Sequence, residues 1–524
     1  MLVPRREFIR YAAATTALGT IALGMGRAAF AAGRPSLVLA VSDNPETLEP
    51  AKELSNVGTR ITYNVFDTLI RRDFLSDAGG GGATLVPHLA TSWRRIDGNG
   101  LELTLRQGVK FHNGDELTAD DVAFTFSSTR LLGDKAPIAE GKAYFGILDR
   151  VEAVDRYTVR FFTKTPDALL EQRLASWASW IVNKRAWLAD GVDGFGKKPV
   201  GTGPYKCKEI RSGEHIRLEA FDDYFMGKPT AQTITFKVIP EVAARISGLV
   251  SGEYDMIVNV PPDQIDMING YSDIETRSVV LANSHVLVYN ASHPVLADKR
   301  VRQALNLAID RKLLVKTLWR NEAVVPPSHQ YPEYGEMFDA SRPIPEYNPE
   351  KARQRLAEAG YKGEPVVYYT QPNYYVNALA AAQILIEMWK AVGVNAQLQV
   401  VENFKQVSAE QMMIRNWSNS TRYPDHLGAL WVAWGPEGSS QKTWKMWKAP
   451  QAFNDLGRKL ESSLDMKARF QLAKSMLDIW EDDAPGTVLY QPLETYAVKK
   501  SIKWRPVTFY YMDLRPYNLQ FPGA

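Results

Sequence analysis

The feature of the sequence that most constrains the fold is an alternation of helix and strand patterns in residues 349–402. Residues 366–370 and 394–401 have the short, β-rich composition of strands, and the apolar stretch 375–392 between them ends at a glycine. A strand, a helix and a second strand of these lengths form a βαβ unit, in which the two strands are parallel and the crossover is right-handed. The unit predicts an α/β fold for this part of the chain.

Strand and helix patterns also occur elsewhere. Residues 36–42 (SLVLAVS) are typical of a buried strand, and residues 101–106 (LELTLR) alternate as a half-buried strand does. Thr118 and Asp121 stand at the spacing of a capping box, which predicts that a helix begins there. Apolar residues at helical spacing predict another helix within residues 298–319.

The composition excludes several classes of protein. With 45% hydrophobic and 23% charged residues, the 524-residue chain is typical of a globular protein of more than one domain. Without the first 31 residues, which hold four arginines and one glutamate, 58 basic and 58 acidic residues remain. The chain therefore lacks the basic stripe of a nucleic-acid or anionic-membrane binder. Cys207 is the only cysteine and excludes an intramolecular disulfide or a multi-thiolate metal site, and the histidines form no HExxH motif.

The first 31 residues are typical of a secretory signal. A basic start, Arg5-Arg6-Glu7-Phe8-Ile9-Arg10, precedes a weakly apolar run and the small-residue pattern Ala29-Phe30-Ala31. The paired arginines favour the twin-arginine type of signal, and an ordinary Sec signal is the alternative. The apolar run is too short to span a membrane. We therefore expect a protein that begins near Ala32 and resides in the periplasm.

Several separated segments together carry a family resemblance. The most specific segment is Gly108 to Phe126, GVKFHNGDELTADDVAFTF. The three further parts are Thr47-Leu48-Glu49-Pro50, Gly201-Thr202-Gly203-Pro204-Tyr205, and Arg300 to Leu305 with Ala308 to Arg311. In their order along the chain the segments resemble family 5 of the extracellular solute-binding proteins, the peptide, nickel and opine receptors of ABC importers.

The resemblance implies an α/β, two-lobed periplasmic-binding-protein fold of the Venus-flytrap kind, with an extra subdomain and a hinge. It places lobe I in residues 32–75, 190–285 and 500–524, the extra subdomain in residues 76–189, and lobe II in residues 286–499. A solute that contacts both lobes stabilises the closed form by its differential affinity. The implied partners are a small-molecule ligand and the transmembrane subunits of an ABC permease, and we expect a monomer.

One segment of the predicted lobe II bears on the ligand. In peptide-binding relatives it resembles Trp-x-x-Asp-Tyr-x-Asp-Pro, and its first acidic residue pairs with the ammonium group of the ligand. In this sequence the matching stretch, residues 419–426, has Arg422 at the place of that acid. A guanidinium repels an amino terminus and suits a carboxylate or phosphate, so we expect an anionic ligand. The alternative is that Arg422 pairs with Asp425 or another acid at the surface.

Further candidate ligand contacts come from position within the family pattern. Trp417 and Trp434 are chosen from a local concentration of tryptophans that also includes Trp431, Trp444 and Trp447, because their rings could stack on an apolar ligand face. Arg60 could be the second cation of a clamp on a dianion. The remaining candidates are Asn56, Tyr63, Trp177, Trp180, His329 and Tyr331.

We expect a receptor for a polar, carboxylate-bearing small molecule, such as an opine-type sugar–amino acid conjugate. The alternative within the same family is a di- or oligopeptide receptor in which Asp425 holds the ammonium group. A secreted hydrolase is a third hypothesis, although neither a GxSxG motif nor a His/Cys cluster is present. A nickel or haem receptor on the same fold is a fourth. We predict no catalytic residues, no metal ligands and no cofactor.

Overall fold

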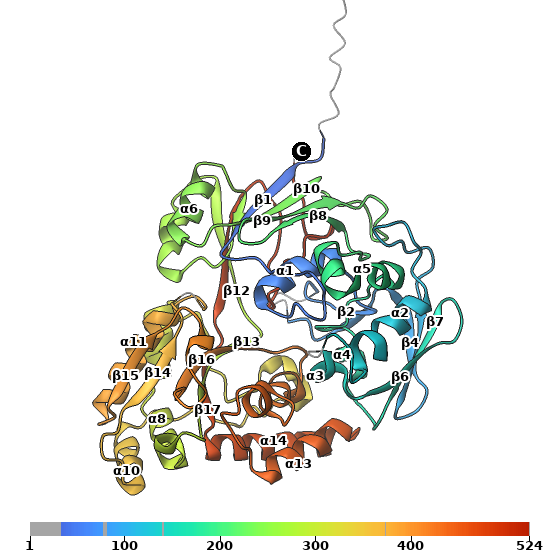
Figure 1. Cartoon of the computed structure of the whole chain (residues 1–524). Helices are drawn as coiled ribbons and strands as arrows, with labels where there is room; N and C mark the ends of the chain where they lie inside the picture. The colour runs from blue at the N-terminus through green and yellow to red at the C-terminus, as the bar shows by residue number, and fades with distance from the viewer. Residues whose placement is uncertain (1–32, 77–80, 139–140, 373, 523–524) are drawn as a thin grey trace, which may run out of the picture. The chain divides into compact units, whose positions relative to one another are not determined.

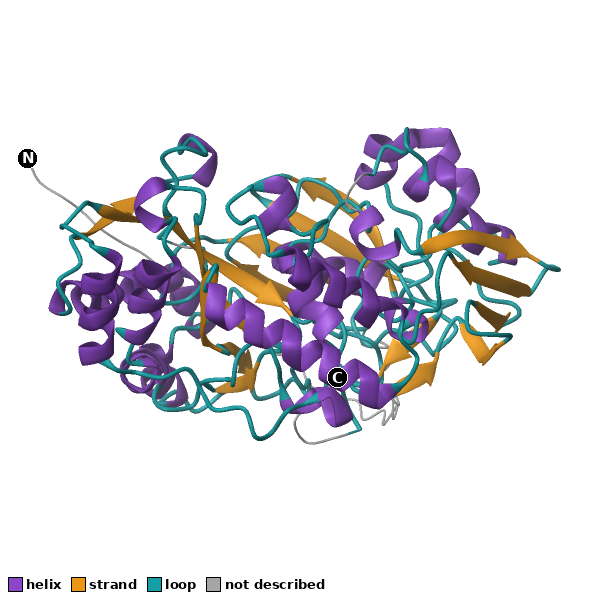
Figure 2. Cartoon of the chain, turned by 90° about the horizontal axis from the view of Figure 1, so that it is seen from below, coloured by secondary structure: helices purple, strands orange, loops and turns teal. Residues whose placement is uncertain are grey.

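The structure, a computed structural model, describes residues 33–76, 81–138, 141–372 and 374–522. The predicted signal segment, residues 1–31, lies outside the described residues. Strands and helices alternate along the described chain (Figures 1 and 2), as an α/β fold requires. The predicted α/β class is confirmed at this level.

A seven-stranded sheet has the order β12-β18-β11-β1-β10-β9-β8. Its central strand β1 is parallel to β10 and β11, and the remaining pairs are antiparallel. The strands are β1 (Ser36–Val41), β8 (Tyr205–Arg211), β9 (His215–Ala220), β10 (Thr233–Val238), β11 (Met256–Ile257), β12 (Ile274–Val280) and β18 (Leu493–Lys499). The helices that accompany them are α1 (Asn56–Val65), α6 (Val242–Val250) and α7 (Ile265–Asn269). The predicted strand at residues 36–42 is confirmed as β1.

A four-stranded antiparallel sheet, in the order β4-β5-β7-β6, forms a separate layer. Its strands are β4 (Ala90–Arg95), β5 (Gly100–Leu105), β6 (Leu148–Ala153) and β7 (Thr158–Thr163), and a small pair consists of β2 (Ile70–Arg72) and β3 (Leu85–Pro87). The neighbouring helices are α2 (Ala119–Thr125), α3 (Lys142–Phe145), α4 (Leu170–Arg173) and α5 (Lys184–Lys197). The predicted capping box is confirmed, since the Thr118 amide donates to Asp121 Oδ2 at 3.1 Å at the start of α2.

A five-stranded sheet has the order β15-β14-β16-β13-β17. Its strands are β13 (Asn283–Tyr289), β14 (Val366–Thr370), β15 (Ala396–Val400), β16 (Ile414–Ser420) and β17 (Gly486–Tyr490). The helices around it are α8 (Lys299–Leu307), α9 (Arg311–Trp319), α10 (Pro349–Ala359), α11 (Ala378–Ala391), α12 (Val432–Trp434), α13 (Gln451–Ser462) and α14 (Met466–Asp483). The predicted βαβ unit is confirmed, because β14 and β15 are parallel and α11 connects them.

The helix predicted within residues 298–319 is instead two helices. Helix α8 ends at Leu307, Asp310 has extended backbone geometry, and α9 begins after it. The Asp310 carboxylate accepts a hydrogen bond from the Leu313 amide at 2.9 Å, so this residue caps a new helix instead of continuing the old one. Apolar spacing alone did not reveal the interruption, because both helices turn the same kind of face to the core.

We call the part of the chain built on the seven- and four-stranded sheets lobe I, and the part built on the five-stranded sheet lobe II. The chain enters lobe II between β12 and β13 and returns between β17 and β18. At this crossing the Leu281 amide donates to the Pro492 carbonyl at 3.0 Å, and Gln491 Nε2 donates to the Leu281 carbonyl at 3.1 Å. Strand β18, within the predicted range 286–499, pairs with β11 and β12 of lobe I. The domain boundaries themselves stay predictions.

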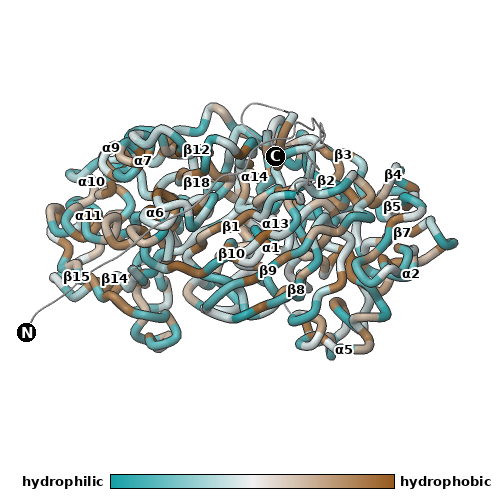
Figure 3. Tube along the Cα trace, turned by 90° about the horizontal axis from the view of Figure 1, so that it is seen from above, coloured by the Kyte–Doolittle hydropathy of each residue, from teal (hydrophilic) through white to brown (hydrophobic). Residues whose placement is uncertain are grey.

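Hydrophobic stretches are spread along the whole described chain (Figure 3) and gather into separate cores. One apolar cluster joins the seven-stranded sheet, α1 and the four-stranded sheet of lobe I. Two others lie on opposite faces of β13, because Leu287 and Tyr289 point to one face while Val286 and Val288 point to the other. Lobe II therefore has helices packed on both faces of its sheet.

Candidate functional site

Residues of the two lobes meet around Arg422, which follows β16. The Ser176 hydroxyl donates to the Arg422 carbonyl at 2.7 Å, and Arg72 Nη1 donates to the same carbonyl at 3.2 Å. Ser176 and Arg72 belong to lobe I, and Arg422 belongs to lobe II. These hydrogen bonds place Arg422, which we predicted to bind the ligand, at the junction of the lobes.

The turn after β16 fixes the backbone of Arg422. Its amide donates to the Gly428 carbonyl at 3.0 Å. A Cβ at position 428 would lie 2.2 Å from the Tyr423 carbonyl oxygen, so only glycine fits there. The sequence therefore builds a tight loop between residues 422 and 428, with Arg422 at its start.

The Arg422 side chain is buried, with an exposed fraction of 8%, and is only partly satisfied. Its Nη1 donates to Asn419 Oδ1 at 3.1 Å and to the Ser420 carbonyl at 2.7 Å, and its Nε lies 3.4 Å from the Tyr144 hydroxyl. Among the residues that the structure describes, Nη2 has no hydrogen-bond acceptor and no carboxylate lies within 4 Å of the guanidinium. An anion beside Nη2 would complete this environment.

Asp425 does not pair with Arg422. Its Oδ2 accepts from Arg469 Nη2 at 2.8 Å, and its Oδ1 accepts from the Leu427 amide at 2.9 Å. Asp425 and Arg469 are both buried within lobe II, with side-chain exposures of 2% and 0%. The carboxylate is thus occupied by its own lobe, and the surface ion pair considered for Arg422 is not formed with this residue.

Arg60, the second cationic candidate, lies near Glu494. It is buried in α1, and its Nη2 lies 3.9 Å from Glu494 Oε1 on β18. The Asn259 amide donates to the same oxygen at 3.1 Å, while burial raises the pKa of Glu494. Arg60 Nε is buried without a hydrogen-bond partner among the described residues. Its role as the second cation of a clamp on a dianion stays a prediction.

Asn56, the first residue of α1, makes a second contact between the lobes. Its Nδ2 donates to the Ser418 hydroxyl at 3.3 Å, and its Oδ1 accepts from the Ser420 hydroxyl at 3.2 Å. Asn283 of β13 donates to both of these hydroxyls at 2.9 Å. These amides and hydroxyls form a neutral polar strip along the ends of β13 and β16. Such groups suit hydroxyl or amide groups of a ligand.

The other aromatic candidates of lobe I differ in position. Tyr63 stacks on Tyr511 with ring centroids 4.2 Å apart, and burial raises its pKa to about 12. Trp180 is 1% exposed and packs edge-on against the same Tyr511, so both candidates lie in the core of lobe I. The Trp177 ring, in contrast, lies 5.4 Å from the Arg422 guanidinium carbon, within the range of a cation–π contact.

Four candidates of lobe II pack into its own core. Trp434 is fully buried, with its ring centroid 6.3 Å from that of Trp417 and 5.9 Å from that of His329. Burial lowers the pKa of His329 to about 3. Tyr331 is also buried, and its hydroxyl bonds to that of Ser284. Of these four, Trp417 is the most exposed, at 9%.

Sequence reasoning missed Ser176, Arg72 and Tyr144. Each contacts Arg422 through space from a segment of lobe I far away in the sequence. Two of these contacts are made to a backbone carbonyl, which carries no side-chain signature. The third contact is made through space to a side chain, so no local pattern in the sequence indicates any of the three residues.

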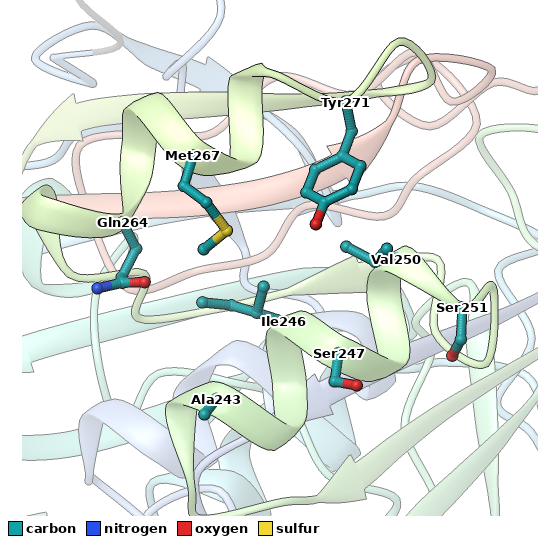
Figure 4. Close-up of a pocket in the computed structure, with 8 residues that line it drawn as sticks. All are labelled: Ala243, Ile246, Ser247, Val250, Ser251, Gln264, Met267 and Tyr271. Atoms are coloured by element: carbon teal, nitrogen blue, oxygen red, sulfur yellow. The ribbon is translucent and has the colours of Figure 1, made fainter.

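A surface groove between α6 and α7 shares no residue with these contacts (Figure 4). Met267 and Tyr271 point toward Ile246 and Val250 across the groove, and no charged side chain lines it. It therefore offers no cation that would pair with a carboxylate.

Within residues 33–76, 81–138, 141–372 and 374–522, no group of three or more His, Cys, Asp or Glu side chains is arranged to hold a metal ion. In the same ranges no helix has both the length and the apolar character needed to cross a membrane.

Comparison with known proteins gives consistent matches. The family of bacterial extracellular solute-binding proteins, family 5 middle, matches residues 84–441. The oligopeptide-binding protein AppA of Bacillus subtilis is 31% identical over 454 residues, which cover 79% of this chain and 80% of the relative.

Two solved structures match with similar coverage. The dipeptide-binding protein of Pseudoalteromonas sp. SM9913 in complex with Met-Leu has a TM-score of 0.83 at 22% identity, and covers 93% of this chain and 100% of its own. The binding protein AgaA of A. tumefaciens R10 in complex with agropinic acid has a TM-score of 0.80 at 22% identity, with coverages of 93% and 99%. At this identity the likeness shows the fold, and the predicted two-lobed periplasmic-binding-protein fold is confirmed.

Proposed function

The chain belongs to family 5 of the bacterial extracellular solute-binding proteins, and we propose that its solute is a polar small molecule that carries a carboxylate. Membership of this family indicates the general function, which is that of a periplasmic receptor for an ABC importer. Such a receptor encloses its solute between two lobes and presents the closed form to the permease. Its relatives are binding proteins of transporters and not enzymes, which fits a role without catalysis.

The observation that carries the carboxylate proposal is the unpaired guanidinium of Arg422. A buried cation is costly unless a counter-charge or hydrogen bonds compensate it. Arg422 has one neutral acceptor side chain and one carbonyl on Nη1, and no described carboxylate within 4 Å. A ligand carboxylate could accept a hydrogen bond from Nη2, and a second one from Nε in place of the long 3.4 Å contact with the Tyr144 hydroxyl, which is the side-by-side geometry that a guanidinium prefers.

Arg72 strengthens the positive charge at this position. Its guanidinium donates only to carbonyls, namely those of Gly82 at 2.7 Å, Gly81 at 3.2 Å and Arg422 at 3.2 Å. No salt bridge joins it to a carboxylate of the described residues. Arg422 and Arg72, which contacts its carbonyl, both lack carboxylate partners among the described residues, and two such cations favour an anion and oppose the ammonium group of a peptide.

An opine-type sugar–amino acid conjugate is the specific solute that we propose. Its carboxylate would bind Arg422, and its hydroxyls would suit the neighbouring Asn283 amide and the hydroxyls of Ser418 and Ser420. The relative AgaA holds agropinic acid on the same fold, which supports the class of ligand. That likeness is at the level of fold, so the proposal depends on the contacts of Arg422.

A di- or oligopeptide is the second candidate, because the 31% identical relative is an oligopeptide-binding protein. In this case Arg422 would bind the carboxylate end of the peptide. Asp425 is a poor site for the ammonium end, since both of its oxygens already accept hydrogen bonds within lobe II. The peptide therefore lacks the acidic partner that we considered for it.

Isothermal titration calorimetry with the purified protein separates the two candidates. The probes are a mannityl-glutamate opine, a dipeptide of neutral residues, and mannitol. Wild type is expected to bind the opine, and Arg422→Ala is expected to bind it roughly 30-fold more weakly, the size of a lost charged hydrogen-bond pair. Arg422→Lys should be intermediate, because lysine keeps the charge but not the planar fork.

Arg458→Ala, an exposed arginine of the same lobe, is the matched control. Binding of the dipeptide alone, with equal affinity in wild type and Arg422→Ala, would overturn the carboxylate proposal and leave the receptor role in place.

The export route and the oligomeric state stay predictions. The twin-arginine route depends on Arg5 and Arg6, outside the described residues, and the monomer is an expectation from the family alone.

A further inference from the structure

A turn of lobe I contacts Arg422 through two of its side chains. Residues 176–179 form this turn, in which Ala178 has a φ of 61° and the Ser179 hydroxyl bonds back to the Ser176 carbonyl. A non-glycine residue in this region costs about 1 kcal/mol or more, and such strain persists where the surroundings impose it. The turn points the Ser176 hydroxyl and the Trp177 ring toward one residue of lobe II.

Both ends of Arg422 are held from lobe I. At the backbone end, Ser176 and Arg72 donate to its carbonyl at 2.7 and 3.2 Å. At the side-chain end, Trp177 and Tyr144 lie with their ring centroids 5.4 and 5.9 Å from the guanidinium carbon. The residue proposed to bind the solute is therefore also the residue through which lobe I contacts this loop of lobe II.

We propose that Ser176 and Arg72 are positioning residues that couple solute binding at Arg422 to closure of the lobes. This inference rests on the proposed function. In the closed form, hydrogen bonds from lobe I fix the position of the Arg422 carbonyl. Because the backbone of Arg422 is then held in place, its guanidinium is positioned to bind the solute. In an open form these hydrogen bonds are absent, so the Arg422 side chain is less well held and binds a carboxylate less well.

The two residues act through Arg422 and not on the solute. All three nitrogens of the Arg72 guanidinium are bonded to backbone carbonyls, and the Ser176 hydroxyl donates its only proton to the Arg422 carbonyl. Both side chains are 2% exposed. Because a solute gains affinity only from its preference for the closed form, weakening these contacts reduces affinity without removing a ligand contact.

The test is Ser176→Ala, measured with the mannityl-glutamate opine. Loss of one buried hydrogen bond that exists in the closed form should weaken binding roughly fivefold to tenfold. Ser176→Thr, which keeps the hydroxyl, should recover most of the affinity. Ser251→Ala is the control, because Ser251 is an exposed serine of lobe I that bonds within its own helix end.

The degree of lobe closure is measured in a separate experiment from the binding affinity. Spin labels at Ser212→Cys in lobe I and Lys362→Cys in lobe II, with Cys207 replaced by serine, report the distance between the lobes. Both label positions are exposed. At a saturating concentration of the opine, Ser176→Ala should keep a larger open fraction than wild type. Arg72→Gln should also keep a larger open fraction than wild type. Agreement between the two variants would show that the effect is not specific to one substitution.

The outcomes distinguish the two proposals. Wild-type affinity and wild-type closed fraction in both Ser176→Ala and Arg72→Gln would overturn the coupling, even if Arg422→Ala abolishes binding. Wild-type affinity in Arg422→Ala would instead overturn the carboxylate proposal, and with it the coupling through Arg422. Weaker binding with a larger open fraction in both variants, together with loss of binding in Arg422→Ala, supports the coupling.

Discussion

Asp425 and Arg469 form an ion pair in the interior of lobe II, with 2.8 Å between Oδ2 and Nη2. Asp425 lies three residues beyond Arg422, and it is the residue that we considered for the ammonium group of a peptide, while Arg469 lies on α14. Because Asp425 is engaged by Arg469, the only acid of residues 419–426 is part of the scaffold of lobe II. The loop therefore carries a cation and no free carboxylate.

Asp425→Asn should destabilise the protein while leaving its solute preference unchanged. The substitution leaves the buried Arg469 without its counter-charge, which costs about 3 kcal/mol in the free energy of unfolding. Urea unfolding followed by tryptophan fluorescence measures this loss. Asp455→Asn removes an exposed partner of Arg458 in the same lobe and should cost less than about 0.5 kcal/mol. A selective loss of dipeptide binding in Asp425→Asn would show that the carboxylate serves the ligand.

His329 should make the protein less stable in mild acid. Its imidazole packs against Trp434 and Trp480, and the nearby His426 opposes its protonation, so its folded-state pKa falls to about 3. A histidine in the unfolded chain titrates near 6.5. The unfolded state therefore binds the proton first, and the contribution of His329 to stability is present above about pH 6.5 and is lost as the pH falls toward 3.

The corresponding variant is His329→Phe, which keeps an aromatic ring in this environment. Between pH 7 and pH 5 the wild type should lose about 2 kcal/mol more stability than the variant, as measured by urea unfolding at each pH. His215→Gln, at a partly exposed position, is the control. Equal pH dependence in wild type and His329→Phe would contradict the assignment.

The sequence predicted well those features that depend on local patterns. The parallel strands β14 and β15 with α11, and the capping box of Thr118 and Asp121, all follow from spacing within a short segment. The break at Asp310 was missed because an aspartate inside an apolar periodicity has two interpretations, a solvent-facing residue or a cap, and tertiary packing decides between them.

The candidate site was less predictable for a physical reason. Arg422 was chosen because its residue type changes the chemistry of a known segment. Arg60 was chosen from its position within the family pattern, and the structure places its guanidinium 3.9 Å from Glu494, a residue more than 400 positions away in the chain. Ser176 and Arg72 contact a carbonyl, for which residue type gives no signal. The sequence therefore did not indicate which residues distant along the chain contact one another in the fold.

Asn56→Ala should weaken binding of different solutes by a similar factor. Its two hydrogen bonds, to Ser418 and Ser420, join the lobes, so their loss disfavours the closed form whatever it encloses. We expect a threefold to tenfold weaker affinity for the opine, and the same factor for any dipeptide that binds, by calorimetry. Asn269→Ala, within lobe I, is the control. Loss of opine binding alone would indicate that Asn56 contacts the sugar hydroxyls directly.

Glu461→Gln should weaken solute binding in a way that depends on salt. Arg173 of lobe I, held by Asp167 at 2.9 Å, also reaches Glu461 of lobe II at 3.2 Å, and Glu461 keeps 27% of its side chain exposed. The pair between the lobes therefore favours closure and is screened by ions.

At low ionic strength the affinity of Glu461→Gln for the opine should be about threefold lower than that of wild type, and at 0.5 M NaCl the two should converge. Calorimetry at both salt concentrations measures the difference, and Glu358→Gln, which removes a pair within lobe II, is the control. Because Arg173 keeps Asp167 in the variant, the thermal stability of the protein should be unchanged. A constant affinity ratio at both salt concentrations would mean that Glu461 acts by packing or hydrogen bonding and not by its charge.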